Sequence, residues 1–394
     1  MGGNGLKVLD KKHLSDSVCV IVGTRPGIIK MSPIIKELGW RQIPFFTLHT
    51  GQHYSYEMDK KFFEDLELPK PLYHLPQCKP GSLHGEQTAN MLSGIESVLV
   101  KAKPRLVLVC GDANTNLAGA LAARKLQIEV GHVESGLRSN DWRMPEEHNR
   151  VIIDHISEYL FAPTPRARQN LINDNVKGKV YLTGNTIVDA LIQHVEIAEN
   201  KSTIMKTLSL PKNGYILTTI HREENVDHID TLTEIIKGLE LIGGNLDFPI
   251  VLPVHPRTKK RFGNFNLWSK LADIQNLTVI DPAGYLDFLV LLKNAALVLT
   301  DSGGIQEESC ILHTPCVTLR ENTERQETVF VKSNIVAGTK PDRVLDAVER
   351  SLGKERDWPN PFGDGKAAKR IVDVSVGIPV TEWDAAFGNK ARLS

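Results

Sequence analysis

The feature that most constrains this chain is an apolar run that breaks at two glycines and passes directly into a helical pattern. Residues 295–299 read as a buried strand, the chain turns at Ser302, Gly303 and Gly304, and a helix is predicted from Ile305 onward. Paired glycines allow a ligand to approach the backbone, and the free N–H groups of a helix's first turn carry partial positive charge. The turn therefore suits a phosphate group, and an ordinary strand-to-helix connection is the alternative.

The same unit of strand, turn and helix recurs along the chain. Residues 18–22 form an apolar run that ends at Gly23, and residues 106–110 form another that ends at Gly111 and Asp112. Further strands are predicted at residues 45–49, 129–130, 159–163, 180–184, 215–220, 248–254, 277–280 and 315–319. Because strands alternate with helices throughout, we predict an α/β fold in which both halves of the chain are doubly wound parallel sheets.

Two domains are predicted, with a boundary where the strand pattern restarts. The first covers residues 1–184, the second covers residues 185–365, and a last amphipathic helix within residues 366–394 is predicted to join the first. Ligands of parallel sheets bind outside the carboxyl ends of the strands, where the polar and glycine clusters of both halves fall. The expected site is therefore a cleft between two facing domains.

The charge balance argues against partners that bind through a charged surface. The chain has 394 residues, of which 41% are apolar and 24% charged, as in an ordinary globular protein. Lysine plus arginine equals aspartate plus glutamate at 47 each, so we expect no nucleic-acid or acidic-membrane partner, and anionic ligands must be bound locally. The apolar run at residues 18–22 is too short for a signal peptide or a membrane span, which predicts a cytoplasmic protein.

Several cofactor and metal motifs are absent from the sequence. It contains no G-x-G-x-x-G, no G-x-x-x-x-G-K-[ST], no H-E-x-x-H and no D-x-D, so we expect neither a redox cofactor nor a metal. The cysteines form no C-x-x-C pair, which predicts reduced packing residues and neither a disulfide nor a zinc site. They are Cys19, Cys78, Cys110, Cys310 and Cys316.

Three segments that follow strands each supply an acidic side chain. Asp112 lies at the end of the predicted strand at residues 106–110, and Glu134 lies in the segment that follows the short predicted strand at residues 129–130. Pro145 fits the first position of a helix, which places Glu146 at the positive end of that helix. Clustered carboxylates raise one another's pKa values, as proton-transfer groups require. The set therefore predicts acid/base chemistry, and complementation of the helix dipole is the alternative for Glu146.

Cations and histidines are predicted at the same edges of the two sheets. Arg25 lies in the turn after the first strand and Lys30 lies one turn into the following helix, with surface solvation as the alternative for Lys30. His221 and His255 each end a core strand of the second half, although a single histidine at a strand end is more often structural. Glu308, one turn into the helix after the paired glycines, could accept hydrogen bonds from sugar hydroxyls beside a diphosphate.

Taken together, these motifs resemble those of the non-hydrolysing UDP-N-acetylglucosamine 2-epimerases, in particular the archaeal-type members. The likeness covers roughly residues 18 to 375, and so many motifs in one order make it specific. The motifs are Gly23-Thr24-Arg25-Pro26 with Lys30, Gly51-Gln52-His53, Gly111-Asp112, His132-Val133-Glu134, Pro145-Glu146-Glu147 with Asn149-Arg150, Gly184-Asn185-Thr186, His221-Arg222, Pro253-Val254-His255-Pro256, residues 301–308 and Thr323-Glu324-Arg325. The resemblance implies two Rossmann-like domains arranged as in GT-B glycosyltransferases.

The resemblance also implies a reaction, the reversible C2 epimerisation of UDP-GlcNAc to UDP-ManNAc. UDP leaves by anti elimination and is added back to a 2-acetamidoglucal, and no cofactor takes part. By the same resemblance Asp112, Glu134 and Glu146 are the acid/base set, and Lys30 and His221 support the departing UDP. The residues that would bind UDP and its sugar are Arg25, His255, Phe288 against the uracil, Ser302, Gly303, Gly304, Glu308 and Arg325.

Other features leave alternatives open. Gln52 and His53 are a possible allosteric site, since many bacterial members contact a second UDP-GlcNAc just after this pair, and a homodimer is expected. The usual family residues are replaced here by Gly27, Ala113, Ser135 and Gln326. Competing functions are a hydrolysing epimerase, a UDP-2,3-diacetamido-glucuronate 2-epimerase, a GT-B glycosyltransferase and a binding protein without catalysis. Three acids buried against an anionic ligand would be costly in a protein that only binds.

Overall fold

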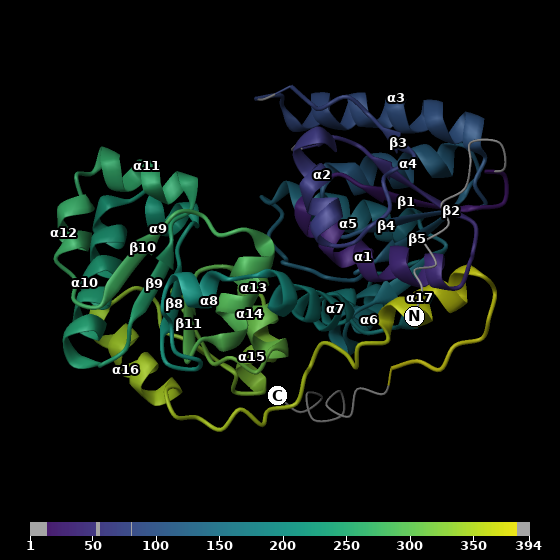
Figure 1. Ribbon diagram of the computed structural model, residues 1–394. Coiled ribbons are helices and arrows are strands. Elements are labelled where there is room, and N and C mark those ends of the chain that lie inside the picture. The colour runs from purple at the N-terminus through teal and green to yellow at the C-terminus, as the bar shows by residue number, and fades with distance from the viewer. Residues whose placement is uncertain (1–13, 53–55, 80, 384–394) are drawn as a thin grey trace. The chain divides into compact units, whose positions relative to one another are not determined.

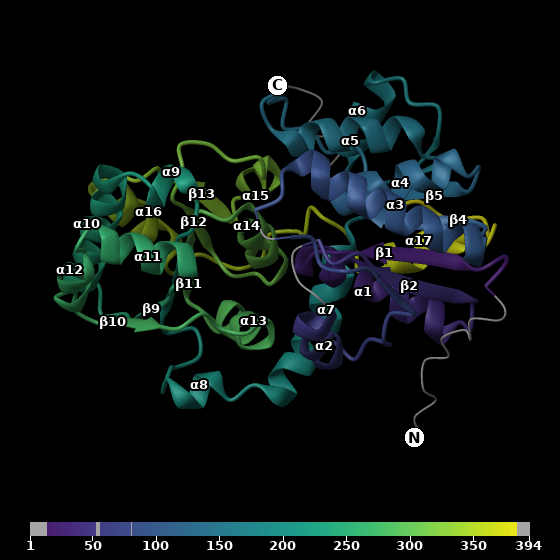
Figure 2. The ribbon, with the colours of Figure 1, turned by 90° about the horizontal axis from the view of Figure 1, so that it is seen from above.

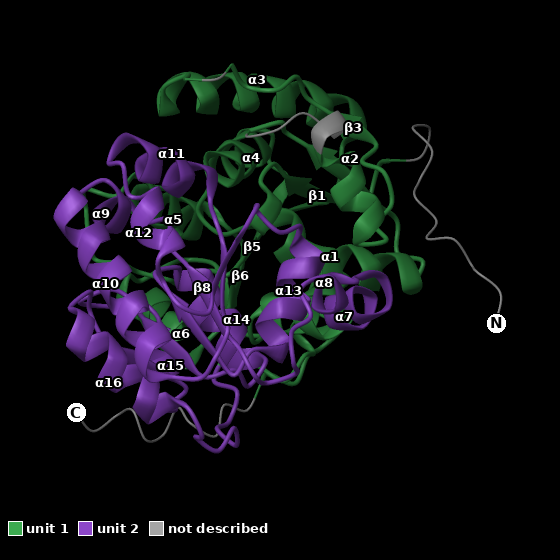
Figure 3. Ribbon diagram, turned by 60° about the vertical axis from the view of Figure 1, so that its left-hand side comes forward, with its two compact units in different colours: residues 1–193, 362–394 green, residues 194–361 purple. Residues whose placement is uncertain are grey.

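The computed structural model describes residues 14–52, 56–79 and 81–383, with helices and strands labelled in Figure 1. The chain divides into two compact units, residues 1–193 with 362–394 and residues 194–361 (Figure 3). The predicted boundary after residue 184 precedes helix α7 (Thr186–Lys201), whereas the units part inside that helix. Each unit is built on a parallel sheet with helices between the strands, which confirms the predicted fold class.

The sheet of the first unit has seven strands within the described residues, in the order β3-β2-β1-β4-β5-β6-β7. They are β1 (Val18–Val22), β2 (Phe45–His49), β3 (Tyr73–His74), β4 (Leu106–Cys110), β5 (Glu129–Val133), β6 (Tyr159–Ala162) and β7 (Lys179–Leu182). All neighbours pair in parallel, and Cys19 of β1 stands opposite Phe46 of β2 and Val107 of β4. Strand order reverses between β1 and β4, so the turns after these strands meet at a topological switch point.

Apolar strand residues of the first unit are covered by helices rich in small side chains. The helices are α1 (Arg25–Trp40), α2 (Tyr56–Asp65), α3 (His84–Ala102), α4 (Asn114–Lys125), α5 (Pro145–Ile156), α6 (Pro165–Asn173), the first part of α7, and α17 (Ala367–Ser375). Helix α4 packs against both α3 and α5 (Figure 2). A Cβ atom on Gly119 of α4 would lie 2.8 Å from Ile21, so the absence of a side chain lets this helix approach the sheet closely.

Strand β5 is longer than the sequence pattern predicts. It runs through Glu129–Val133, whereas residues 129–130 alone were expected, because Gly131 and His132 interrupt the apolar run. Their backbones nevertheless pair with β4, and the side chain of His132 is fully buried. A buried polar side chain on a strand needs partners inside the protein, and these are described below.

The sheet of the second unit has six strands within the described residues, in the order β10-β9-β8-β11-β12-β13. They are β8 (Ile216–Thr219), β9 (Ile250–Pro253), β10 (Leu277–Ile280), β11 (Leu297–Thr300), β12 (Cys316–Thr318) and β13 (Asn334–Val336). All neighbours again pair in parallel, and Leu299 of β11 stands opposite Thr218 of β8 and Val317 of β12. The order reverses between β8 and β11, which makes the turns after these strands the switch point of this sheet.

Alternate residues of β11 pack on opposite faces of the second sheet. Leu297 and Leu299 belong to a cluster with Ile235 of α10, while Val298 belongs to another with Leu291 of α13. The helices are α8 (Ile204–Thr207), α9 (Glu223–Val226), α10 (Ile229–Asn245), α11 (Pro256–Asn264), α12 (Trp268–Ala272), α13 (Tyr285–Asn294), α14 (Gly303–Ile311), α15 (Gln326–Phe330) and α16 (Pro341–Ser351). Both faces of the sheet are thus covered, as continuous apolar strands require.

The C-terminal helix α17 is part of the first unit and packs beside α1 (Figure 1). Asp189 of α7, which is 4% exposed, accepts hydrogen bonds from the backbone N–H groups of Ala367 and Ala368 at 3.2 and 2.9 Å. Farther along the helix, Asp373 accepts a hydrogen bond from Arg41 at 2.6 Å. One acid thus caps the helix start, and another ties the helix to the end of α1.

Two further observations bear on the predicted environment of the protein. No helix in the described ranges combines the length and apolar character that a membrane crossing requires. The five cysteines are free and buried. Burial raises the pKa of the Cys19 and Cys110 thiols, so these side chains stay protonated and pack as apolar residues.

The start of α17 should make stability depend on pH. Burial raises the pKa of Asp189 to about 6, so native protein binds a proton that the unfolded chain has lost above its ordinary pKa. The contribution of Asp189 to the free energy of unfolding should therefore fall as pH rises from 4 to 7. Between pH 4 and pH 7, Asp189→Asn should lose up to about 3 kcal/mol less unfolding free energy than the unchanged protein. Urea denaturation at both pH values measures this difference.

Asp373→Asn is the matched control, because it changes an acid of the same helix whose pKa moves the other way. Burial alone would raise the pKa of Asp373, but Lys369 and Arg41 lower it below its ordinary value. Asp373 therefore stabilises the protein above its unfolded pKa and loses that contribution as pH falls through its folded pKa. If the pH dependence of the unfolding free energy changed in the same direction in Asp189→Asn and Asp373→Asn, the account would be contradicted.

Candidate functional site

Two of the predicted acids follow neighbouring strands of the first sheet. Asp112 comes after β4 and Glu134 after β5, and the last residues of these strands, Cys110 and Val133, stand opposite each other. Gly111 turns the chain before Asp112 with a φ of 76°, and Glu134 itself has a φ of 66°. A positive φ is uncommon for a residue with a side chain, and it turns the chain sharply after β5.

Glu134 is paired with Lys30. The ammonium group of Lys30, on α1, forms an ion pair with Oε2 of Glu134, whose side chain is 5% exposed. The Sγ atom of Cys110 lies 3.9 Å from the same oxygen. The structure therefore brings one predicted acid and one predicted cation together from two different elements.

Asp112 is held by α5. The Nε and Nη2 atoms of Arg150 lie 2.9 and 2.5 Å from Oδ2 of Asp112. The Asn149 amide donates to the carbonyl oxygen of Asp112 at 2.8 Å, and the Nη1 atom of Arg150 donates to Glu147 at 2.6 Å. The sequence marked these α5 residues only as parts of a motif, because nothing in their spacing indicates a contact with the turn after β4.

The two glutamates at the start of α5 have different surroundings. Glu147 is 2% exposed and accepts hydrogen bonds from the backbone N–H groups of Ser139 and Asn140 at 2.9 and 3.2 Å. Burial alone would raise the pKa of Glu147, but these hydrogen bonds and Arg150 lower it below its ordinary value. Glu146 is half-buried, and its side chain forms no hydrogen bond or ion pair within the described part of the chain.

The predicted cation Arg25 begins α1. Thr24 caps this helix by accepting a hydrogen bond from the N–H group of Gly27 at 3.2 Å. The Nε atom of Arg25 lies 3.0 Å from Oδ1 of the buried Asp59, while 45% of the arginine side chain is exposed. The buried carboxylate thus fixes a guanidinium group beside the first turn of the helix.

Gln52 has a structural contact that the sequence did not indicate. Its Oε1 atom accepts hydrogen bonds from the N and Oγ1 atoms of Thr115 at 2.8 and 2.7 Å. These hydrogen bonds lie at the start of α4, where the N-cap residue Ala113 has no side chain that could cap the helix. An allosteric role for Gln52 stays a prediction, and His53 lies outside the described residues.

In the second unit, His221 and Asp301 form a pair at the switch point. The Nδ1 atom of His221, after β8, lies 2.9 Å from Oδ1 of Asp301, after β11. The fully buried carboxylate also accepts from the backbone N–H groups of His221 and Arg222 and from the Asn225 amide, at 2.9 to 3.1 Å. Burial alone would raise the pKa of Asp301, but His221 and these N–H groups lower it. Asp301 therefore orients His221, with Nδ1 toward the carboxylate.

His255 lies beside His221, with the ring centroids 5.6 Å apart. Its Nδ1 atom accepts a hydrogen bond from the N–H group of Arg257 at 3.2 Å, at the start of α11. Burial, and then the charges of His221 and Arg257, lower the pKa of His255, which favours the neutral ring. A neutral ring whose Nδ1 accepts carries its proton on Nε2, and that atom can donate to an anionic ligand.

Helix α14 begins at the paired glycines, as predicted. Ser302 is its N-cap, with Oγ 3.5 Å from the N atom of Ile305. A Cβ atom on Gly303 would lie 2.3 Å from the carboxylate of Glu324, so a side chain here would require Glu324 to move. On Gly304 the nearest atom to a Cβ would be Ser302 Oγ at 4.0 Å, so this exposed glycine opens onto unoccupied space. The N–H groups of this first turn are therefore accessible to an anion.

The remaining predicted residues of the second unit lie on or beside neighbouring helices. Arg325, directly before α15, has its Nε atom 3.3 Å from Oε2 of Glu307. Glu308 of α14 adds to burial in raising the pKa of Tyr285. Phe288 of α13 is partly buried against the apolar cluster that contains Val298 and Leu291.

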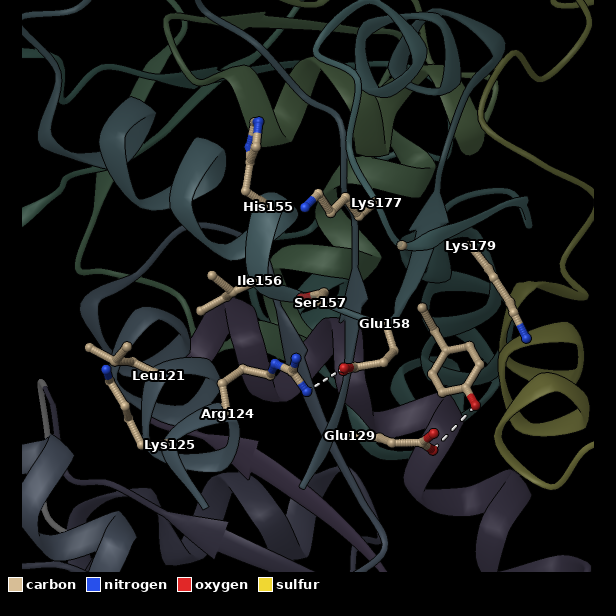
Figure 4. A pocket seen from close by; sticks show the side chains of 12 residues that line it. Leu121, Arg124, Lys125, Glu129, His155, Ile156, Ser157, Glu158, Lys177 and Lys179 are labelled. Carbon is tan, nitrogen blue, oxygen red and sulfur yellow. Dashed lines mark hydrogen bonds and ion pairs between the residues drawn. The ribbon is translucent and has the colours of Figure 1, made fainter. Parts of the chain in front are cut away.

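A separate pocket lies at the opposite edge of the first sheet. It has a volume of about 560 Å³, and Glu129, Tyr159 and Lys179, which are the first residues of β5, β6 and β7, line it (Figure 4). Two contacts join polar groups of the lining, since Arg124 forms an ion pair with Glu158 and the Tyr159 hydroxyl donates to Glu129 at 3.2 Å. No predicted site residue lines this pocket.

The two edges suit different parts of one chemistry. The first unit presents carboxylates held against cations, and the second presents histidines beside a helix start with accessible N–H groups. Fold and site together define a two-unit α/β enzyme equipped for proton transfer and anion binding. The chain belongs to the UDP-N-acetylglucosamine 2-epimerase family, whose model matches residues 39–375, which confirms the predicted resemblance.

Individual relatives agree with this assignment. The UDP-N-acetylglucosamine 2-epimerase of Methanococcus maripaludis is 53% identical over 361 residues, which cover 91% of this chain and 98% of that protein. The crystal structure of Methanocaldococcus jannaschii UDP-GlcNAc 2-epimerase in complex with UDP-GlcNAc and UDP superposes with a TM-score of 0.81, at 51% identity, covering 92% of this chain and 99% of that one. The UDP-2,3-diacetamido-2,3-dideoxy-D-glucuronate 2-epimerase of Pseudomonas aeruginosa is 40% identical, covering 90% of this chain and 98% of that protein.

The buried Asp301 should support the stability of the second unit. Asp301→Asn removes a fully buried carboxylate that accepts hydrogen bonds from two backbone N–H groups and the Asn225 amide, and loss of such charged hydrogen bonds should cost about 2 kcal/mol or more. Because its pKa is lowered on folding, the acid stabilises above its unfolded pKa and loses this contribution as pH falls. The difference from the unchanged protein, measured by urea denaturation, should therefore narrow from pH 7 toward pH 3.

Asp281→Asn is the control, since this acid follows β10 of the same sheet but is 84% exposed beside Lys259. Its effect on the free energy of unfolding should stay below about 1 kcal/mol. Equal losses of unfolding free energy in Asp301→Asn and Asp281→Asn would contradict a specific role for the buried Asp301.

Proposed function

We propose that this protein interconverts UDP-GlcNAc and UDP-ManNAc by inverting the configuration at C2. The carrying observation is the pair of carboxylates after β4 and β5, each held against a cation at the switch edge of the first sheet. Proton transfer at a carbon atom needs such positioned groups. Two comparisons support the choice of sugar. The chain belongs to the epimerase family, and it is 53% identical to a relative named UDP-N-acetylglucosamine 2-epimerase but 40% identical to the diacetamido-glucuronate epimerase.

The chemistry explains why both acids and anion-binding groups are needed. The C2 proton is not next to a carbonyl group, so it becomes acidic only as the C1–O bond breaks and positive charge grows at C1. A carboxylate takes the proton, UDP leaves with the bonding electrons, and a 2-acetamidoglucal remains. UDP then forms a new bond to C1 while an acid delivers a proton to the other face of C2. Substrate and product have the same atoms and oxidation state.

The first unit supplies the proton-transfer groups. We assign the acid/base set to Asp112, Glu134 and Glu146, with Lys30 beside the leaving group and beside Glu134. Fixed charges stabilise a transition state more than solvent does, because they need not reorganise as the reaction proceeds. The ion pairs to Lys30 and Arg150 support such fixed positions for the first two acids.

The second unit supplies most of the nucleotide-binding groups. The N–H groups after Ser302 and the Nε2–H group of His255 would bind the diphosphate, and His221 would stabilise the departing UDP. Gly303 and Gly304 would contribute to the same diphosphate site, and Arg25 and Arg325 would contact the phosphates and the sugar. Phe288 would pack against the uracil, and Glu308 would bind sugar hydroxyls.

We further propose that the protein works in the cytoplasm as a homodimer, with nucleotide sugars and not nucleic acid as its ligands. The balanced charge of 47 basic and 47 acidic residues supports the absence of a nucleic-acid partner, and the five buried thiols support the cytoplasmic location. Sedimentation of the purified protein tests the oligomeric state.

Gly304 is the sharpest test of the nucleotide site. A side chain at this position meets no atom of the protein closer than 4.0 Å, so loss of affinity in Gly304→Val would report the ligand and not a damaged fold. The dissociation constant for UDP, measured by calorimetry, should rise by about tenfold or more. The control is Gly244→Val on α10, where a Cβ also meets no atom within 4 Å. Unchanged UDP affinity in Gly304→Val would refute this site.

Removing any acid of the set should slow turnover without preventing nucleotide binding. Asp112→Asn, Glu134→Gln and Glu146→Gln should each lower kcat by about a hundredfold or more, with UDP affinity largely unchanged. Glu129→Gln, at the other end of β5 from Glu134, is the control and should keep its turnover.

The products identify the reaction. NMR of the mixture should show UDP-ManNAc formed from UDP-GlcNAc. Release of free ManNAc would indicate a hydrolysing enzyme, and conversion of the diacetamido-glucuronate nucleotide alone would change the sugar. Full turnover in all three acid variants would remove them from the mechanism.

A further inference from the structure

Behind the acids of the first unit lies a buried chain of charged side chains that the proposed function does not use. His132 of β5 and Asp154 of α5 are both fully buried, with Nδ1 and Oδ1 2.6 Å apart. The other oxygen of Asp154 lies 2.7 Å from Nη2 of Arg138, and Arg138 donates to Asp174 at 2.7 and 2.9 Å. This series of side-chain contacts therefore leads from the partly exposed Asp174 to the imidazole of His132 in the interior.

Both ring nitrogens of His132 face oxygen atoms. The Nε2 atom lies 3.0 Å from the carbonyl oxygen of Gly111, which can only accept a hydrogen bond. The Nδ1 atom faces Asp154, whose second oxygen accepts from the backbone N–H group of Gly136 at 3.1 Å and from Arg138. With an acceptor oxygen at each ring nitrogen, the geometry fits a His132 that donates from both nitrogens and is paired with an Asp154 carboxylate.

These contacts reach both turns that carry the acids. His132 binds the carbonyl group of Gly111, the residue directly before Asp112. Asp154 binds the N–H group of Gly136, in the turn that contains Glu134, while His132 lies one residue before the end of the strand that leads into that turn. Glu134 has a positive φ, and for a residue with a side chain such a backbone conformation persists only where the surroundings hold it.

We propose that His132 and Asp154 are positioning residues for Asp112 and Glu134. The protonated imidazole fixes the turn after β4, the carboxylate fixes the turn after β5, and the ion pair between them sets the distance between the turns. Neither side chain touches substrate. The proposal rests on the proposed function, because it gives the two carboxylates their catalytic value.

Two substitutions of His132 separate the contacts. The amide of glutamine reaches about as far as Nε2, so His132→Gln can still donate to the Gly111 carbonyl. The shorter asparagine can replace only the Nδ1 contact with Asp154. We expect His132→Asn to lower kcat by about tenfold or more, with KM and UDP affinity unchanged within about twofold, and His132→Gln to recover several-fold of that loss. A purely structural histidine would show no such recovery in kcat.

Controls separate positioning from stability. Asp154→Asn should lower kcat in the same way, whereas Asp189→Asn, which alters an equally buried acid that accepts two backbone N–H groups elsewhere in this unit, should not. His313→Asn, a histidine of the second unit next to Trp358, should also leave kcat unchanged. The Tm of each variant shows what part of any loss comes from unfolding.

The outcomes are distinct. Epimerisation by the unchanged protein, together with the asparagine loss and the glutamine recovery, supports the proposal. Unchanged kcat in His132→Asn, or losses in both variants that match their unfolded fractions, overturns it. No epimerisation by the unchanged protein instead overturns the proposed function. If the variants do not fold, nitrogen-15 NMR of the native ring at pH 7 decides, because two protonated nitrogens support the ion pair and one unprotonated nitrogen refutes it.

Discussion

Parallel strand pairing is the constraint on which the site depends. Within each unit every described strand runs parallel to its neighbours, so every turn from strand to helix falls on one edge of the sheet. This places Asp112 beside Glu134 in the first unit and His221 beside Asp301 in the second, although each pair is distant in sequence. Polar side chains gather at these edges because the strands themselves are filled with apolar residues.

Gathering charges at a sheet edge is costly unless each has a partner, and the structure supplies one in almost every case. Lys30 pairs with Glu134, Arg150 with Asp112, and Asp301 with His221. These partners arrive on helices α1 and α5 and in the turn after β11, so the same packing that forms the core fixes the charges. Groups held in this way are already oriented when substrate binds, which is the main electrostatic contribution of an enzyme.

The sequence predicted most strands, although not β3 and β13, together with the glycine turn at which α14 begins and the candidate residues, because each is a local pattern. It could not predict their partners. Arg150, Asp301 and the His132–Asp154 pair act across elements, and contacts of that kind leave no periodic signal. The expected short strand at residues 129–130 failed for the same reason, since His132 looks polar in the sequence but is satisfied by Asp154 and Gly111 in the fold.

The central claim is that carboxylates of the first unit remove and replace the proton at C2 while UDP departs and returns. Conversion of UDP-GlcNAc by the unchanged protein in heavy water, followed by NMR of both recovered nucleotide sugars, tests it directly. The account predicts deuterium at C2 of the UDP-ManNAc that forms, because the proton removed exchanges with solvent before another is delivered. UDP-ManNAc that retains the original hydrogen at C2 would contradict the elimination mechanism.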